Sequence, residues 1–454
     1  MVKRITRRGF FASTAAALAT SAAAAKAYAQ GGEAETTKRA IEKGLTKESA
    51  EIVEPVLPLE LDGNVYQLKS SDDLSPLPMN PAEDTFPRVD YKKSYSMPPS
   101  TMGRQMGQVQ TIGQPSMGYE MDGNVKVFTL IAQPVETEIT YGFTKETYKI
   151  IDESGDYSAF KYRPTASKKL LGWGFNGICP GPTLEAYEGD RVRIIVKNEL
   201  PQPTSIHWHG FMIPFAQDGA TGYYPWNAAK PILPGQSHTY EFTLHQSGTL
   251  MYHSGFNVLI QEGMGLGGMF IVHPKRPENK IDCDVAILLQ QWNFFPGNAA
   301  PNLMSMQAKI ATFNGKTMPT LPMINCKQGD RVRLRFGNLS LLAHPIHIHG
   351  YDFEIVGTTG GPIPKSARYR ESTITIEPGQ SRDVEFVAWN PGTWRLHCHV
   401  LHHTVNMMPN APMGIMPPEG MFTYVNVKPS DPNYDVKSLN APWKFEGDSW
   451  TDIR

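Results

Sequence analysis

Cysteine is scarce in this chain of 454 residues, which contains four: Cys179, Cys283, Cys326 and Cys398. Four cysteines give too few crosslinks for a disulfide framework to hold together a fold of this size. One pair could still form in an oxidising compartment. If Cys398 binds a metal, three thiols remain and one of them stays unpaired.

Long apolar runs and an excess of charge are missing too. After the N-terminal residues, no stretch stays apolar over the roughly 20 residues that cross a bilayer as a helix. The 43 lysines and arginines nearly balance the 44 aspartates and glutamates. A chain without a basic excess lacks the electrostatic footprint of a nucleic-acid-binding protein. Composition therefore argues against a membrane-spanning protein and against a nucleic acid partner.

The first 29 residues have the features of an export signal. They begin with a basic segment that contains Arg7 and Arg8, continue through a short Ala-rich region and end at Ala29. That order is typical of a cleaved signal and not of a membrane span. The TRRGFF context resembles the twin-arginine signal, which exports folded proteins across the bacterial inner membrane. We therefore expect a periplasmic protein.

Residues 30–123 are polar and rich in proline and methionine, as in SPLPMNPAEDTFP. We expect a mostly irregular N-terminal arm. Its methionines could bind copper through their thioethers, but methionine also fills gaps in packing, and we favour a packing or linker role. The arm contains Met79, Met97, Met102, Met106, Met117 and Met121.

The chain then repeats itself, which indicates tandem domains. EGDRVRIIVKNELPQPTSIHWHG at 188–210 matches QGDRVRLRFGNLSLLAHPIHIHG at 328–350, at a constant offset of 140 residues. PGQSHTYEFTLHQSGTLMYHSG at 234–255 matches PGQSRDVEFVAWNPGTWRLHCH at 378–399, at an offset of 144 residues. Two copies of one domain therefore follow one another.

Each copy is expected to be all-β. Apolar and polar residues alternate in RVRIIVKN, HTYEFTL and DVEFVAW, and Pro-Gly and Asn-Gly turns separate such runs. A period of two indicates strands, and many short strands with little helical periodicity favour a Greek-key sandwich or barrel. We place the first domain at 124–274, the second at 275–429 and a C-terminal tail at 430–454.

Histidine pairs separated by one residue mark three motifs. These are HWHG at 207–210, HPIHIHG at 344–350 and HCHVLHH at 397–403. In a strand, side chains at i and i+2 share a face, so each pair presents two imidazoles to one point. Cys398 should then face away from His397 and His399. His344 is an odd number of residues from the other histidines of its motif, which is consistent with its facing the Cys398 side.

This parity predicts two metal sites joined by one tripeptide. A thiolate, two imidazoles and a thioether form the soft ligand set typical of blue copper. The chain supplies that set as His344, Cys398, His403 and Met408. The opposite face gathers imidazoles, which suit a copper cluster. Electrons that arrive at Cys398 would have only a short covalent path through His397 and His399, so we predict these as the catalytic residues.

The motifs, in this order and spacing over about residues 124–430, resemble those of the multicopper oxidase family, the laccase-like enzymes. The resemblance implies two tandem cupredoxin-like Greek-key β-barrels and copper of types 1, 2 and 3. The type 1 copper would be held by His344, Cys398, His403 and Met408. The type 2 copper would be held by His207 and His347. The paired type 3 coppers would be held by His209, His253, His349, His397 and His399.

The family's eighth cluster histidine falls at Gly255, where the motif reads MYHSG. We expect a cluster that binds copper less tightly, and Gly255→His should raise copper content if the space admits an imidazole. Alternatively, the glycine marks a bulge or a close backbone approach, and His253 is a remnant.

The repeat also assigns counterparts of the blue site in the first copy. They are Thr204, Ser254, Leu259 and Met264. Only the methionine is a possible ligand, so we expect no type 1 copper in the first domain.

Other histidines and methionines carry weaker signals. A single histidine is more often a core or surface residue than a ligand, and we apply that interpretation to His238, His245, His273 and His402. The C-terminal methionines could pack a loop or relay Cu(I) to the blue site, and the sequence leaves both open. They are Met407, Met413, Met416 and Met421.

The resemblance implies an oxidase that couples one-electron oxidation of a phenolic compound or a metal ion such as Cu(I), Fe(II) or Mn(II) to reduction of O₂ to water. The 140 residues between HWHG and HPIHIHG leave no room for an inserted domain. In similar two-domain oxidases the clusters form between neighbouring chains, so we expect a homotrimer. The alternatives are a blue-copper electron-transfer or copper-tolerance protein with a cluster impaired at Gly255, and a scaffold without copper.

Overall fold

The computed structural model describes the following parts of the chain: residues 59–61, 64–66, 107–143, 164–221, 229–293, 301, 303, 306, 308, 310–317, 320–406 and 420–436. Several predicted features lie outside these parts. They are the export signal, Met408, four arm methionines (Met79, Met97, Met102 and Met106) and the C-terminal Met407, Met413 and Met416.

Strands dominate the described residues, which confirms the all-β prediction. The chain divides into two compact units, residues 1–74 and 75–454. In the first unit, β1 (Leu59–Leu61) and β2 (Asn64–Tyr66) form an antiparallel pair. The other described elements belong to the second unit, which contains both copies of the repeat.

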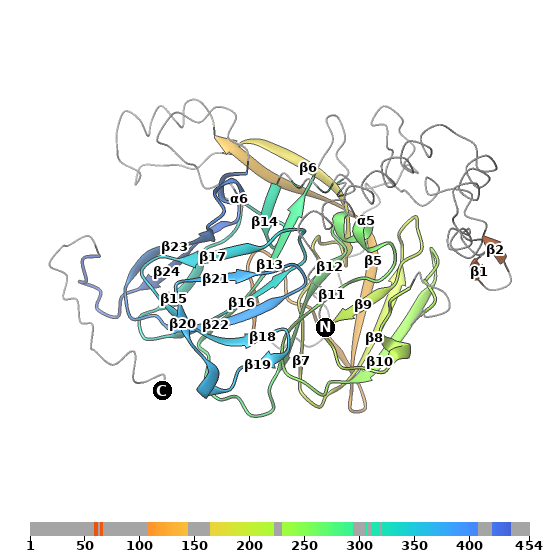
Figure 1. The fold of residues 1–454 in the computed structure, drawn as a ribbon, viewed down its shortest axis with the longest axis horizontal. Coiled ribbons are helices and arrows are strands. Elements are labelled where there is room, and N and C mark those ends of the chain that lie inside the picture. The colour runs from red at the N-terminus through yellow and green to blue at the C-terminus, as the bar shows by residue number, and fades with distance from the viewer. Residues whose placement is uncertain are drawn as a thin grey trace, which may run out of the picture. The chain divides into compact units, whose positions relative to one another are not determined.

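The first copy is built on two facing sheets (Figure 1). One sheet has the order β10-β8-β5-β4, with β6 also paired to β5, and consists of β4 (Glu120–Asp122), β5 (Val125–Phe143), β6 (Pro164–Phe175), β8 (Arg191–Asn198) and β10 (Ser237–Thr243). The other has the order β7-β12-β11-β9 and consists of β7 (Leu184–Tyr187), β9 (Ile206–His209), β11 (Gly248–Ser254) and β12 (Gly267–His273). Alternate residues of β8 are buried, as its sequence period predicts. Their side chains join an aromatic core around Trp208 and Phe270.

The second copy repeats this plan. Its larger sheet has the order β14-β13-β16-β22-β18-β19, with β20 paired to β18 and β3 paired to β13. It consists of β3 (Gln110–Thr111), β13 (Cys283–Trp292), β14 (Ile310–Phe313), β16 (Arg331–Asn338), β18 (Phe353–Thr358), β19 (Gly361–Pro362), β20 (Arg370–Glu371) and β22 (Ser381–Val387). The facing sheet has the order β15-β24-β23-β17-β21 and consists of β15 (Ile324–Lys327), β17 (His344–Ile348), β21 (Thr373–Ile376), β23 (Gly392–Cys398) and β24 (Phe422–Lys428).

A short helix follows the histidine-bearing strand in each copy. In the first copy it is α5 (Val258–Gly263), after β11, and in the second it is α6 (Leu401–Val405), after β23 (Figure 1). Among the described residues, the other helical turns are the 3₁₀ helices η5 (Phe215–Gln217) and η6 (Lys365–Ala367). Among the described helices, none has the length and apolar character that a membrane span requires.

The C-terminal end of the predicted arm packs into the fold. Ile112 joins the core of the second copy, whereas Met117 joins that of the first. Val109 lies in a third apolar cluster with Met251 and Leu288, which come from different copies. The buried position of Met117 agrees with the packing role that we favoured. This part of the arm is therefore a strap across both copies.

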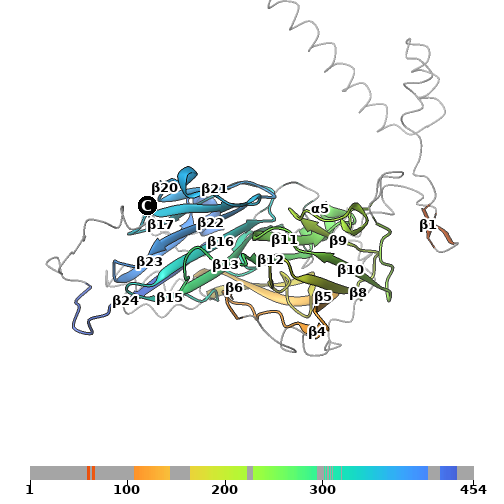
Figure 2. The same ribbon diagram turned by 90° about the horizontal axis from the view of Figure 1, so that it is seen from below.

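The first copy also extends over the second through its longest strands. Figures 1 and 2 show β5 and β6 running from the first copy toward β13. Val135 and Ile139 of β5 pack there with Trp292 and Ile310, which belong to β13 and β14. The sequence periodicity did not predict this extension.

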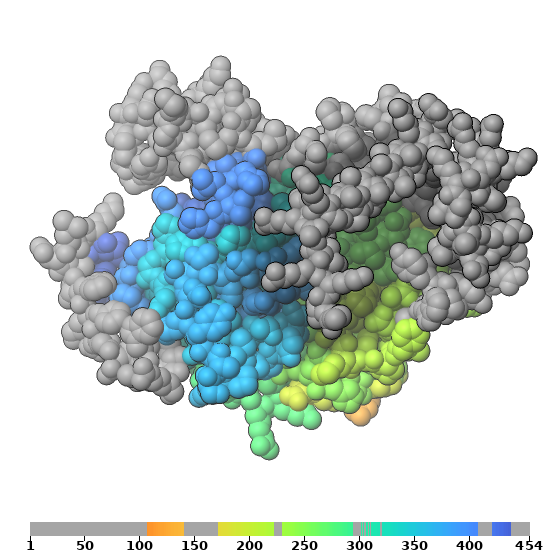
Figure 3. All heavy atoms as spheres, viewed as in Figure 1, coloured from red at the N-terminus to blue at the C-terminus, as the bar shows by residue number. Residues whose placement is uncertain are grey.

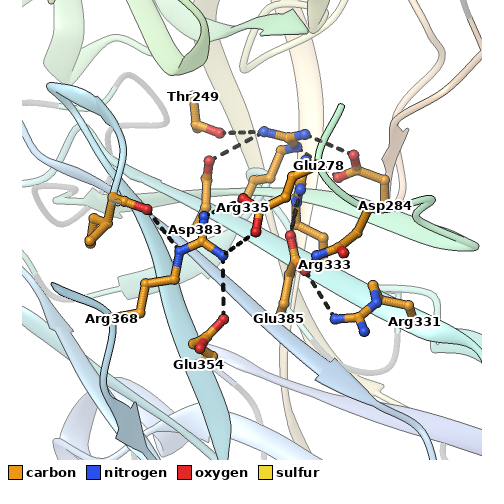
Figure 4. Close-up of polar contacts among 12 residues, drawn as sticks. Thr249, Glu278, Asp284, Arg331, Arg333, Arg335, Glu354, Arg368, Asp383 and Glu385 are labelled. Carbon is orange, nitrogen blue, oxygen red and sulfur yellow. Dashed lines mark hydrogen bonds and ion pairs between the residues drawn. The ribbon is translucent and has the colours of Figure 1, made fainter. Parts of the chain in front are cut away.

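Buried charges hold the two copies together as well. The Arg335 guanidinium on β16 makes two bonds to Asp284, at 2.7 and 2.8 Å, and a third to Asp383 at 3.3 Å (Figure 4). Its Nη1 also donates to Thr249 Oγ1 at 3.1 Å, and Thr249 belongs to β11 of the first copy. Removing one member of such a buried network leaves an uncompensated charge, typically at a cost of about 3–5 kcal/mol. The contact between the copies is visible in Figure 3, where cyan and blue atoms meet green ones.

Candidate metal centres

The first candidate site joins a thiol and two imidazoles in the second copy. His344 begins β17, Cys398 ends β23 and His403 lies on α6. Cys398 Sγ lies 3.7 Å from His344 Nδ1 and 3.6 Å from His403 Nδ1. All three side chains are buried, and their donor atoms lie within 4.8 Å of one another. His344 therefore faces the Cys398 side, as strand parity predicts.

Neutral groups support this site from behind. Ser340 Oγ lies 2.7 Å from His344 Nε2, and the Gln291 amide lies 3.3 Å from His403 Nε2. Both imidazoles therefore turn Nδ1 toward the sulfur and Nε2 away from it. Such outer contacts fix the orientation of metal-binding histidines.

Burial prepares the three side chains for a metal. It lowers the pKa of His344 to about 3 and that of His403 to about 4. It raises the pKa of the Cys398 thiol to about 12. The imidazoles are thus neutral and able to bind at neutral pH, whereas the thiol must release a proton when a metal binds. One soft sulfur and two imidazole nitrogens suit copper.

The second candidate site lies in the first copy and consists of His207, His209 and His253. Their donor atoms lie within 4.8 Å of one another, and His253 is paired directly opposite His207 on neighbouring strands. Trp208, between the first two, is buried on the opposite face. His207 and His209 therefore share one face of β9, as their i and i+2 spacing predicts.

In each of these three rings, one nitrogen contacts an oxygen atom of a neighbouring residue. His207 Nδ1 donates to Asp218 O at 3.0 Å, and His209 Nε2 donates to Gly379 O at 2.7 Å. His253 Nδ1 meets the Glu262 carboxylate at 2.6 Å. His209 Nδ1 and His253 Nε2 lie within hydrogen-bonding distance of each other, at 3.1 Å, and one donor atom from each of the three rings lies within 4.8 Å of the others.

Glu262 gives His253 its electrostatic environment. Burial disfavours the charged imidazole, but the Glu262 carboxylate outweighs this effect and raises the pKa of His253. By contrast, burial lowers the pKa of His209, with a further contribution from His253. A carboxylate that accepts from the rear nitrogen of a histidine also makes the front nitrogen a stronger metal ligand.

The other predicted cluster histidines form a third group on β17 and at the end of β23. The pairs 347–349, 347–397, 347–399 and 349–397 have ring centroids 5.0, 5.7, 5.6 and 5.3 Å apart. His349 Nε2 and His397 Nε2 lie 3.1 Å apart, and His347 Nδ1 donates to Ser372 O at 2.7 Å. His399 is exposed. The predicted cluster histidines of the second copy therefore lie close together, three of them half-buried and one exposed.

The rings of the two histidine groups do not contact one another in the described structure. In the described part of the structure, no ring contact joins His207, His209 or His253 to the group on β17 and β23. His209 does reach the second copy, but its partner there is the carbonyl of Gly379. Of these two groups, only that of the first copy has three donor atoms within 4.8 Å of one another in the described structure.

Gly255 lies where backbone segments approach closely. A Cβ atom at this position would lie 2.3 Å from Gly219 O and 2.9 Å from Ser205 Oγ. The Gly255 amide donates to Ser205 O, and its carbonyl accepts from Thr221 N. We expected Gly255→His to gain copper only if an imidazole fits. The structure leaves no room for an imidazole, so this condition is not met. The structure favours a close backbone approach, although His253 still lies with His207 and His209.

The counterpart of the blue site in the first copy is filled by hydrogen bonds. Gln261 Oε1 accepts from Thr204 Oγ1 at 2.7 Å and from Ser254 Oγ at 2.5 Å. Its Nε2 donates to Pro203 O at 2.8 Å. Met264 is buried in the apolar core. These positions offer neither a thiol nor an imidazole, and the absence of a type 1 copper from the first copy stays a prediction.

The remaining histidines join no metal group within the described residues. His273 is buried and paired with Glu185 at 2.9 Å. His238 packs edge-on against Tyr240. His245 and His402 are exposed. The cysteines Cys179, Cys283 and Cys326 are unpaired thiols.

Sequence reasoning missed the residues that orient the ligands. Asp218 and Glu262 lie 11 and 9 residues after their histidine partners, and Gln291 lies 112 residues before His403. Their residue types are common, and no repeated spacing links them to the motifs. Only the folded chain brings them to the rings.

Known proteins resemble this chain along both copies. Two family profiles, each described as Multicopper oxidase, match residues 158–277 and 295–410, which together make up just over half of the chain. The chain is 31% identical over 252 residues to Laccase-19 of Oryza sativa subsp. japonica, a match that covers 50% of this chain and 40% of the laccase. It is 35% identical over 146 residues to Copper resistance protein A of Pseudomonas syringae pv. tomato, covering 32% of this chain and 23% of that protein. The match thus spans less than half the length of these relatives.

Solved structures of similar size also share the fold. The multicopper oxidase mgLAC superposes with a TM-score of 0.54 and 28% identity, covering 69% of this chain and 90% of that one. The blue copper oxidase from Nitrosomonas europaea superposes with a TM-score of 0.53 and 27% identity, covering 72% of this chain and 92% of that one. The ligand groups, the all-β cupredoxin-like fold and these matches lead to one conclusion: the chain belongs to the laccase-like multicopper oxidase family.

Proposed function

We propose that this protein is an oxidase that takes electrons singly from a reducing substrate and passes four of them to O₂, forming two waters. The carrying observation is the tripeptide His397-Cys398-His399. Its cysteine lies in the buried three-residue site, while its histidines lie in the surface group on the other face of β23. One strand thereby connects two metal centres of different ligand chemistry.

The proposed ligands follow from these groups. A type 1 copper would be held by His344, Cys398 and His403, with Met408 as the fourth ligand proposed from the sequence. A type 2 copper would be held by His207 and His347, and paired type 3 coppers by His209, His253, His349, His397 and His399. When bound, the type 1 copper would accept single electrons and the cluster would reduce O₂.

The chain itself would supply the electron path and the local order. Cys398 is bonded directly to both neighbouring histidines, and its carbonyl also accepts a hydrogen bond of 2.9 Å from His397 Nδ1. Thr404 Oγ1 donates to the same carbonyl and links it to α6. These contacts would keep the path between the two centres short and rigid.

We also propose that the clusters are completed between chains. Among the described residues, no ring contact joins the histidines of the first copy to those of the second, and His399 of the second copy is exposed. A head-to-tail contact that closes by rotation would bring them together. A homotrimer with three shared clusters is the assembly that we infer, in the periplasm if the N-terminal segment acts as an export signal.

The proposed reductant is a phenolic compound or a metal ion such as Cu(I), Fe(II) or Mn(II). Oxygen consumption by copper-loaded protein, measured with a phenolic dye, Cu(I) and Fe(II) in turn, tests both the activity and the substrate class. We expect at least one donor to drive O₂ uptake, with four electrons consumed per O₂. Blue protein that consumes no O₂ with any donor would contradict the proposed oxidase.

The closed backbone at Gly255 supports one alternative, in which the protein carries electrons or confers copper tolerance without rapid O₂ reduction. The relative named Copper resistance protein A gives this alternative a second support. Copper per chain, together with visible and EPR spectra, separates the two functions. A full set of type 1, 2 and 3 signals supports the oxidase, whereas a type 1 signal alone supports the electron carrier.

A further inference from the structure

Gln291 lies behind the blue site without being part of it. It occupies β13 next to Trp292, and its side chain is buried, with 4% of the residue exposed. Its Nε2 lies 3.3 Å from His403 Nε2, while its Oε1 has no hydrogen-bond partner in the described structure. An unpartnered buried oxygen typically costs about 1–3 kcal/mol, so this amide calls for an explanation.

The chemistry of the imidazole supplies that explanation. His403 Nδ1 faces Cys398 Sγ at 3.6 Å, so a metal in this site would take Nδ1. A neutral imidazole that gives Nδ1 to a metal carries its proton on Nε2 and becomes a donor there. Without the metal, the proton can occupy Nδ1, and Nε2 is then an acceptor. The polarity of the contact with Gln291 must therefore reverse when metal binds.

A side-chain amide can serve both states. It offers two donors at Nε2 and an acceptor at Oε1, and the two ends have nearly the same shape. Nε2 donates to the metal-free imidazole, and after a half-turn of the amide Oε1 accepts from the metal-bound one. Neither a carboxylate nor an apolar side chain can do both at neutral pH.

We propose that Gln291 is a positioning residue of the type 1 site, which holds His403 in both metal-free and copper-bound forms and occupies its outer Nε2 edge. This inference rests on the proposed function, because it assumes that copper binds at His344, Cys398 and His403. It implies that the reductant delivers electrons without a hydrogen bond to His403 Nε2.

The contact at His344 follows the same principle. Its partner, the Ser340 hydroxyl at 2.7 Å, also donates or accepts as required. Within the described residues, neither ring of the blue site touches a carboxylate, whereas His253 of the cluster does. A neutral support withholds the negative charge that would stabilise Cu(II), so the type 1 copper should be the more easily reduced centre.

The test uses full-length copper-loaded protein and the variants Gln291→Met and Gln291→Glu. Gln290→Met is the matched control, since Gln290 is the adjacent residue, is equally buried and also has an unpartnered Oε1. Gln291→Met should lower the affinity for type 1 copper by about tenfold, the smaller end of the usual effect of an outer contact. Gln290→Met should leave that affinity unchanged.

The decisive measurement is the reduction potential of Gln291→Glu as a function of pH. The potential of its type 1 copper should fall as pH rises from 5 to about 9, because the ionised carboxylate stabilises Cu(II). A wild-type potential at every pH in this range would overturn the inference, whatever the methionine variant does. If the wild-type protein itself takes up no type 1 copper, the proposed function fails instead, and the two failures are distinguishable.

Discussion

The two copies of the repeat share a strand followed by a short helix, but different side chains fill the space beside them. In the second copy, Cys398 at the end of β23 and His403 on α6 face His344, and the later residue Val405 is apolar and buried. In the first copy, the counterpart of Val405 at the offset of 144 is Gln261. This amide fills the space with bonds to Thr204 and Ser254. The same fold thus holds a candidate metal site in the second copy and a hydrogen-bonded Gln261, which we call the plug, in the first.

A second pair of counterparts differs as clearly. His399 in the second copy corresponds to Gly255 in the first. His399 is exposed, whereas Gly255 is buried against the backbone of Gly219. A missing ligand in this chain therefore reflects a different local packing and not merely a substituted side chain.

The largest effect on colour and turnover should come from replacing Cys398, whose counterpart in the first copy is Ser254. Cys398→Ser removes the thiolate, so the intense blue band should vanish and turnover should fall by more than about 100-fold, since even an outer contact is worth 10–100-fold. Visible spectroscopy and O₂ uptake measure both. The matched control is Ser254→Cys, which should not create a blue site while Gln261 fills the space. A blue Cys398→Ser protein would refute the assignment.

Next in size should be the loss of the carboxylate behind His253. Glu262→Gln keeps the shape but removes the charge, and should weaken copper binding at the cluster by about 10–100-fold. Competition with a chelator measures this, with exposed Glu120→Gln as the control. Equal copper retention in both variants would show that Glu262 only packs against the ring.

Filling the space at Gly255 should destabilise the first copy. Gly255→Ala places a methyl group 2.3 Å from Gly219 O and should cost about 1–3 kcal/mol of unfolding free energy. Gly255→His should cost more and add no copper. Gly360→Ala is the control, because the nearest atom to its Cβ would be Thr358 Oγ1 at 3.5 Å. Urea denaturation distinguishes them, and an unaltered midpoint for Gly255→Ala would disprove the close approach.

Removing the plug should have a similar or smaller effect. Gln261→Ala leaves the hydroxyls of Thr204 and Ser254 and the carbonyl of Pro203 without this partner, which should cost about 1–3 kcal/mol. The matched variant in the second copy, Val405→Ala, removes only apolar volume. If Gln261→Ala unfolds at the wild-type urea concentration, water replaces the amide and the plug contributes no net stability.

The metal-free protein should also respond to acid, and this response separates the copies through His344 and His403. The folded pKa values of about 3 for His344 and about 4 for His403 lie below the unfolded value of about 6.5, so below that pH the unfolded chain binds more protons. Stability should therefore be complete above pH 6.5 and fall as pH decreases toward 4, by about 1.4 kcal/mol per pH unit for each histidine. Thr204 and Leu259 of the first copy do not titrate.

Urea titrations of metal-free protein at several pH values measure that slope. His344→Gln should reduce it by one histidine's share, whereas exposed His245→Gln should preserve it. A slope that is the same in all three proteins would contradict the assigned role of burial at His344.

Local sequence rules predicted on which face of its strand a side chain lies, because this direction depends on strand parity alone. The buried Trp208, Ile348 and Cys398 between half-buried or exposed histidines follow directly from the period of two. The absence of blue-site ligands in the first copy also follows, because a repeat at fixed offset needs no coordinates to compare residue types.

The same rules could not predict what surrounds the ligands. Glu262 reaches His253 only because α5 turns back along β11, and Gln291 reaches His403 only because β13 and α6 pack around β14. Residue types such as Gln and Glu carry no signal for such contacts. Whether a side chain fits at position 255 likewise depends on the distance to the backbone of Gly219.

The sequence by itself determined the all-β repeat, the copper-binding residue types and the face of the strand on which each ligand lies, because these depend on order and period along the chain. Tertiary structure alone decided which ligands share a site, which groups orient them and whether position 255 has room for a side chain. Those properties depend on distances between segments far apart in sequence, and such distances are set by packing of the sheets as a whole.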